Sequence, residues 1–122
     1  MNSNGPPENN SHSEATMGWS TEAAAALQEG RAAQVRPRGH SMVGRISDGD
    51  LVTLMLCNAE ELTVGDIVLV RIQGKRFSHA VLHGLLSVEG ERFLICSHQG
   101  RVDGWVDRGD IYGIVTEIKA QP

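Results

Sequence analysis

The sequence predicts a mainly β protein, a compact and strongly bent β fold with one short N-terminal helix. Six short segments, most of them rich in Val, Ile and Leu, are separated by turns that contain Gly and Asp. This spacing is typical of small all-β folds. A single Ala-rich segment precedes them and has the composition of a helix.

The first part of the chain is polar. Residues 1–19 are rich in Asn, Ser, Gly, Pro and Glu and contain almost no aliphatic side chains, so they cannot bury enough apolar surface to fold. We therefore expect a disordered tail over residues 1–19 and one domain over residues 20–122.

The helix is predicted from its end signals and its composition. Ser20 or Thr21 is a suitable N-cap, residues 23–27 are strong helix formers, and Gly30 provides a C-terminal stop.

The expected strands cover residues 33–38, 51–57, 67–72, 76–85, 92–96 and 111–118, and the expected turns cover residues 47–50, 64–66, 73–75, 89–91 and 108–110. The dipeptide Gly-Asp recurs in three of these turns, beginning at Gly49, Gly65 and Gly109. The intervals are uneven, so the recurrence indicates repeated turn chemistry and not a repeat architecture.

Composition argues against nucleic-acid and membrane partners. The formal net charge of -4 is mild and has the wrong sign for binding a phosphate backbone. Residues 21–29 are too few and too charged at their ends to cross a bilayer, and no basic-then-apolar signal segment opens the chain. We expect a soluble, cytoplasmic protein in which Cys57 and Cys96 are reduced thiols.

Ser41 is the first candidate for chemistry, because it follows Gly39 and His40 after a predicted strand. A serine on a tight turn can expose its hydroxyl beside free backbone amides. A serine hydroxyl must pass its proton to a base, and an imidazole is mostly neutral at pH 7. His79, near the start of a later strand, is the candidate base.

The order of these segments resembles the serine peptidase superfamily of bacterial repressor self-cleavage domains and type I signal peptidases. The resemblance covers about residues 33–118, and most members use a lysine where this chain has His79. Histidine at that position is similar to archaeal and eukaryotic signal peptidases. The matching pieces are, in order, Gly39-His40-Ser41-Met42, Gly49-Asp50-Leu51-Val52, Gly65-Asp66-Ile67-Val68, the strand around His79, and Ile111-Tyr112-Gly113-Ile114-Val115.

The resemblance implies a soluble serine endopeptidase that acts on a peptide or protein substrate without a metal or cofactor, with Ser41 as nucleophile and His79 as base. Related signal peptidases carry an acid in the loop that Asp103 occupies here, so the resemblance implies Asp103 as the residue that orients His79. An Asp-Gly turn is the other interpretation of Asp103.

Two alternatives remain open. The chain has Cys96-Ser97 where the family has Gly-Asp, and it lacks the proline that usually follows Ser-Met. These departures favour a peptide-binding or regulatory module without turnover. Strand alternation could also bring together four zinc ligands, namely His79, His83, Cys96 and His98.

Overall fold

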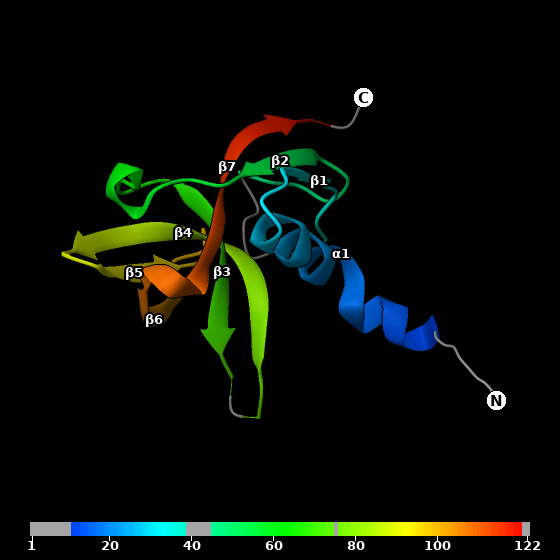
Figure 1. The fold of residues 1–122 in the computed structure, drawn as a ribbon, viewed down its shortest axis with the longest axis horizontal. Coiled ribbons are helices and arrows are strands. Elements are labelled where there is room, and N and C mark those ends of the chain that lie inside the picture. The colour runs from blue at the N-terminus through cyan, green and yellow to red at the C-terminus, as the bar shows by residue number, and fades with distance from the viewer. Residues whose placement is uncertain (1–10, 39–44, 75, 121–122) are drawn as a thin grey trace.

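The computed structural model describes residues 11–38, 45–74 and 76–120, with the backbone alone for residues 11–18. This part of the chain forms one α-helix and one antiparallel sheet, so the predicted mainly β fold is confirmed (Figure 1). In chain order the elements are α1 (Ser11–Gln28), β1 (Ala33–Val35), β2 (Leu51–Met55), η2 (Ala59–Glu61), β3 (Ile67–Gln73), β4 (Ser78–Glu89), β5 (Arg92–Cys96), β6 (Val102–Asp107), η3 (Arg108–Asp110) and β7 (Ile111–Lys119), where η marks a short 3-10 helix.

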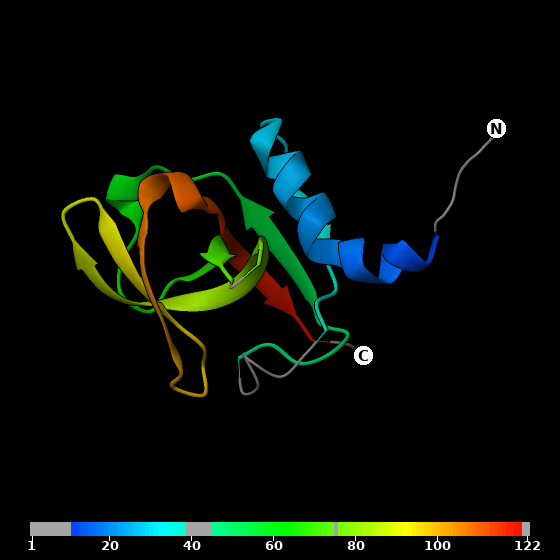
Figure 2. The same ribbon diagram turned by 90° about the horizontal axis from the view of Figure 1, so that it is seen from below.

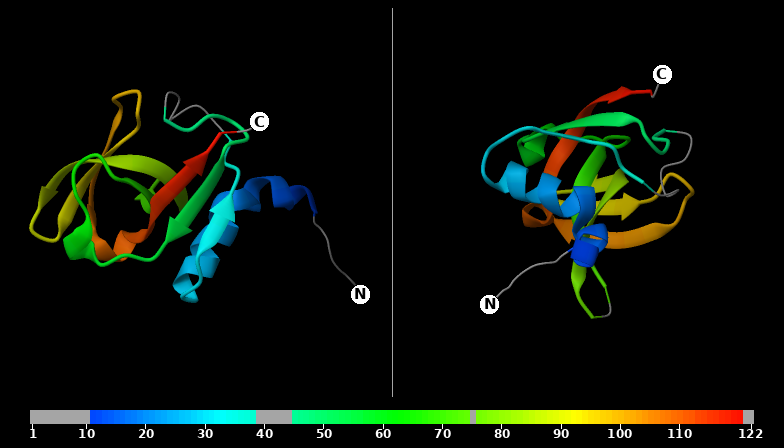
Figure 3. Two further views of the ribbon diagram at one scale, coloured as in Figure 1. Left: turned by 90° about the horizontal axis from the view of Figure 1, so that it is seen from above. Right: turned by 90° about the vertical axis from the view of Figure 1, so that its right-hand side faces the viewer.

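The strands lie in the order β1-β2-β7-β3-β4-β5-β6. The C-terminal strand β7 therefore lies between β2 and β3 and joins the pair β1 and β2 to the four strands β3 to β6. Figures 2 and 3 show that the sheet curves strongly, with α1 against the end formed by β1 and β2 and with β5 and β6 on the far side. The long strand β4 connects these two regions.

Helix α1 ends as predicted but begins earlier. Gly30 has a φ of 86°, its N–H donates to the carbonyl of Leu27, and the N–H of Arg31 donates to the carbonyl of Ala26. These two bonds form a Schellman C-cap. The helix starts at Ser11 instead of Ser20 or Thr21, within the segment that the sequence predicts as a disordered tail.

The apolar side chains form two clusters, one on each face of the central strands. Strand β3 supplies both, because Ile67 and Leu69 pack with Leu27 of α1 while Val68 and Val70 pack with apolar residues of β4 and β5, namely Leu85, Phe93 and Ile95. Both faces of β3 are therefore buried, which explains its continuous run of aliphatic residues. Trp19, which the sequence places in the disordered tail, packs against the cluster beneath α1.

The three Gly-Asp turns share one hydrogen-bond pattern, which confirms repeated turn chemistry. In each, the aspartate side chain accepts a hydrogen bond from the backbone N–H three residues earlier. The pairs are Ser47 to Asp50 at 2.9 Å, Thr63 to Asp66 at 2.9 Å, and Asp107 to Asp110 at 3.1 Å. Each aspartate thereby closes the turn just before a strand.

One strand was not predicted from the sequence. Val102–Asp107 forms β6, an edge strand paired with β5, where the sequence favours a loop. Its six residues include a glycine and two aspartates, which are uncommon in strands. Pairing with the hydrophobic strand β5 outweighs this weak local preference.

Candidate functional site

His79 and His83 lie on the same face of β4. They are four positions apart, with Val81 between them on that face, and they pair across to Ile72 and Val68 of β3. Their environments differ sharply. His79 is exposed, whereas His83 is only 8% exposed.

The buried imidazole of His83 binds Asp103. Nδ1 of His83 contacts Oδ2 of Asp103, and the two side chains are 11% and 13% exposed. When Asp103 is ionised it can only accept a hydrogen bond, and the contact then requires the proton on Nδ1 of His83. Nε2 is then the ring nitrogen that can exchange a proton with another group.

A β-bulge positions Asp103 for this contact. Ile95 pairs with Gly104, but the next residue of β5, Cys96, pairs with Val102, so Asp103 is the extra residue of β6. Gly104 has a φ of 125°, a backbone conformation that residues other than glycine rarely adopt. A bulge of this kind redirects a side chain, and here it lets Asp103 reach His83.

Both histidines and Asp103 line a pocket of about 460 Å³, which we call the histidine pocket. Ser97 is buried on its wall, and its hydroxyl accepts a hydrogen bond of 3.2 Å from the N–H of Arg101. The lining residues are Ile72, Gln73, Gly74, His79, His83, Ser97, Gln99, Arg101, Val102 and Asp103.

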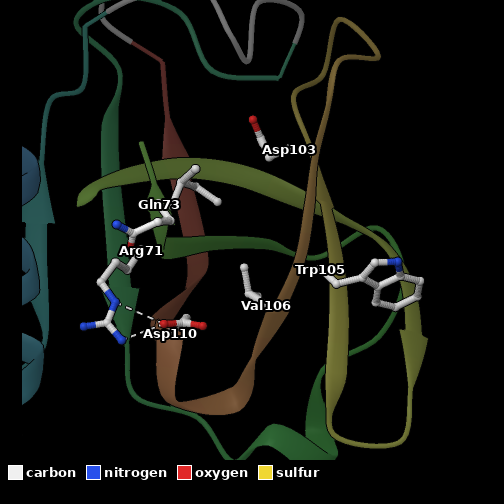
Figure 4. Close-up of a pocket in the computed structure, with 7 residues that line it drawn as sticks. Arg71, Gln73, Asp103, Trp105, Val106 and Asp110 are labelled. Atoms are coloured by element: carbon white, nitrogen blue, oxygen red, sulfur yellow. Dashed lines mark hydrogen bonds and ion pairs between the residues drawn. The ribbon is translucent and has the colours of Figure 1, made fainter. Parts of the chain in front are cut away.

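A second pocket of about 190 Å³ adjoins the first and shares Ile72, Gln73 and Asp103 with it. Figure 4 shows Arg71 and Asp110 joined by hydrogen bonds at one end and Asp103 at the other. The shorter bond, from Nη2 of Arg71, is 2.7 Å, and this contact raises the pKa of the guanidinium above its ordinary value. Arg71 is thus already paired with Asp110.

The predicted site residues are only partly described. Ser41 lies outside the described residues. His79 and Asp103 do line one pocket, but the structure pairs Asp103 with His83 and not with His79. Residues four apart along a strand lie about 13 Å apart, so the carboxylate that binds His83 does not bind His79 at the same time.

The four candidate zinc ligands do not come together. Cys96 pairs with Gly84, the neighbour of His83, so its side chain faces the opposite side of the sheet. His98 lies in the turn after β5. Among the residues that the structure describes, no three His, Cys, Asp or Glu side chains are arranged to hold a metal ion.

The contact between His83 and Asp103 is the main feature that the sequence did not predict. The four-residue spacing of His83 from His79 was visible, but the acid was assigned to the earlier histidine because of the resemblance.

Both cysteines are free thiols. Within the described ranges, no helix is long and apolar enough to cross a membrane.

Comparison with protein-family models, with curated proteins and with solved structures finds no match to this chain.

Proposed function

We propose that this chain is a serine endopeptidase that hydrolyses a peptide bond with Ser41 and a histidine of the histidine pocket. The observation that carries the proposal is the His83–Asp103 pair, a buried imidazole held by a carboxylate on a pocket wall. This pairing is what a histidine base requires, because the acid fixes the tautomer and stabilises the imidazolium. The nucleophile is proposed from the sequence resemblance alone.

The reaction proceeds in two acyl-transfer steps. The serine oxygen bonds to the carbonyl carbon of the substrate while its proton passes to the imidazole. The imidazolium then gives this proton to the amine nitrogen as the C–N bond breaks, leaving an acyl-enzyme. Water, activated by the same imidazole, releases the carboxylic acid product and restores the serine hydroxyl.

A fluorophosphonate probe tests for the nucleophile without a known substrate. The serine oxygen bonds to phosphorus, fluoride leaves, and the hydroxyl proton is transferred to the base. We expect intact-mass spectrometry to show one adduct, mapped to Ser41 by peptide analysis. Ser41→Ala should abolish labelling, and Ser87→Ala, a change in β4 away from the pocket, should not. Labelling that persists in Ser41→Ala would refute the assignment.

A peptide-binding module without turnover is the second candidate. Strand β6 is an edge of the described sheet, and two of its residues, Val102 and Asp103, line the histidine pocket. An edge strand can add an extended peptide by main-chain hydrogen bonds alone. An immobilised peptide library screened against wild type and Ser41→Ala separates the two functions. Equal, stable binding by both proteins with no cleavage would favour the module.

A further inference from the structure

We propose that an extended peptide with an acidic side chain binds in the opening between the end of β3 and the outer edge of β6, and that it forms hydrogen bonds with both strands. We call this opening the β3–β6 seam, and it is bounded by residues 71–73 and 102–106. This binding mode rests on peptide binding, which both proposed functions share, and it holds with or without turnover.

The end of β3 has one side without a strand neighbour in the described sheet. Strand β7 pairs with β3 only as far as Val70, whereas the pairing with β4 continues to Gln73. The N–H of Gly74 donates to the carbonyl of Phe77 at 3.0 Å, so the backbone groups of Gly74 point toward β4. Because this direction alternates along an antiparallel strand, the N–H and carbonyl groups of Arg71 and Gln73 point away from β4 and toward the seam.

Strand β6 pairs with β5 alone, so it also has a free side. At its start, the carbonyl of Arg101 accepts a hydrogen bond of 2.9 Å from the N–H of Ser97, so the backbone groups of the next residue, Val102, point away from β5. At its end, the N–H of Asp107 donates at 3.1 Å to a side chain of η3 and not to β5. Alternation then places the backbone groups of Trp105, two residues earlier, on the same free side.

The two free sides line one pocket of about 190 Å³, the second pocket described above. Figure 4 shows Arg71 and Gln73 on one side of it and Val106 on the other. A strand placed between two edges can form main-chain hydrogen bonds with both. Ile72 and Val106 pack against the apolar cluster that contains Phe93. The peptide side chain that lies between them faces this cluster, so we expect it to be apolar.

The charged residues that line the two pockets determine the charge of the peptide. Asp110 is bound by Arg71 at 2.7 Å. Asp103 is bound by His83. Both carboxylates of the linings are therefore already paired, whereas the exposed guanidinium of Arg101 makes no ion pair with any residue of the described ranges. An acidic side chain at this end of the seam provides the missing partner.

An affinity selection tests the charge preference. The probe is a pool of blocked hexapeptides with random side chains, and the immobilised protein is full-length Ser41→Ala, so that the proposed peptidase does not consume the pool. We expect the retained peptides to be enriched in Asp or Glu near one end by about two- to fivefold, the effect of one exposed ion pair. Arg101→Gln should remove this enrichment. Arg108→Gln, an exposed arginine that lines neither pocket, should preserve it.

An N-methyl scan of the best-retained peptide distinguishes the seam from a single free edge. Each methyl group removes one main-chain donor. A strand between two edges uses consecutive N–H groups, so methylation at either of two adjacent central residues should weaken binding by about 5- to 10-fold in fluorescence anisotropy. If only alternate positions matter, the peptide pairs with one strand and the proposed binding mode is wrong.

Amide NMR of the same complex locates the peptide. The N–H signals of Arg71, Gln73, Val102 and Trp105 should shift and become protected from hydrogen exchange. Gln34 in the edge strand β1 is the control and should not respond. Shifts confined to β1, or retained peptides without acidic enrichment, would overturn the proposal.

The outcomes for binding and for catalysis are separate. Peptides that bind in the seam but are not cleaved by wild type leave the binding mode intact and argue against the peptidase. Fluorophosphonate labelling of Ser41 in a protein that retains no peptide would support the peptidase and refute binding in the seam.

Discussion

Gly113 of β7 lies directly against Leu27 of α1. A β-carbon on this glycine would come within 3.0 Å and 3.2 Å of the two terminal carbons of Leu27 and within 2.7 Å of the carbonyl oxygen of Met55. The helix thus reaches the sheet so closely because residue 113 has no side chain. Gly113 belongs to one of the segments that carry the family resemblance, and its role here is helix packing.

Gly113→Ala is therefore expected to destabilise the protein by about 1–3 kcal/mol, because the added carbon overpacks a contact that includes a backbone atom. Urea denaturation of wild type and variant measures the change. Gly84→Ala in β4 is the matched control, since its β-carbon would meet its nearest atoms at 3.7 Å and 3.8 Å, which is ordinary contact. Equal stability of the two variants would mean that α1 does not pack this closely.

Gly104→Ala tests the bulge that positions Asp103. The φ of 125° at residue 104 is strained for alanine, although the surrounding space is open. We expect a loss of about 1–3 kcal/mol in the free energy of unfolding and a weaker contact between Asp103 and His83. Gly109→Ala, whose β-carbon would also meet open space but without a positive φ, should change stability little. A stable Gly104→Ala with an unchanged His83 NMR signal would contradict the role of the bulge.

Local signals in the sequence were sufficient for most of the fold. The Gly-Asp turns and the aliphatic segments between them were predicted because each turn is closed by its own aspartate, within four residues. Strand β6 was missed because its stability comes from pairing with β5, a contact that its own residues do not indicate. The early helix start at Ser11 was missed because the polar composition of residues 1–19 predicted a disordered tail.

The candidate site was predictable in its residue types but not in its pairing. The sequence offered His79 as the base, and the resemblance implied Asp103 as the acid that orients it. Which histidine receives the acid depends on a one-residue shift of register between Ile95 and Cys96. Such a shift redirects a side chain, and the sequence around it, Asp103-Gly104, is equally typical of a turn.

The thiol of Cys57 offers a test of local electrostatics. Burial raises its pKa above the ordinary value, and the negative charges of Glu61 and Asp66 raise it further. A higher pKa leaves less thiolate at a given pH, so iodoacetamide should alkylate Cys57 slowly at neutral pH and faster as the pH rises. Glu61→Gln removes one negative charge, lowers the pKa of the thiol, and should speed alkylation by less than about tenfold.

Peptide-level mass spectrometry measures the alkylation of Cys57 separately from that of Cys96. Glu60→Gln is the control, because Glu60 is the exposed neighbour of Glu61 and is not among the groups that raise the pKa of this thiol. An identical rate in wild type and Glu61→Gln would mean that the charge of Glu61 does not affect the reactivity of Cys57.

Trp19 tests where the folded domain begins. The sequence places the boundary after residue 19, but the structure packs Trp19 against the apolar cluster beneath α1. Trp19→Ala should therefore lower the free energy of unfolding by about 1–3 kcal/mol, less than for a fully buried tryptophan. Glu22→Ala, an exposed change in the same helix, should have little effect. If both variants unfold at the same urea concentration as wild type, Trp19 contributes nothing to the core and the boundary belongs after residue 19.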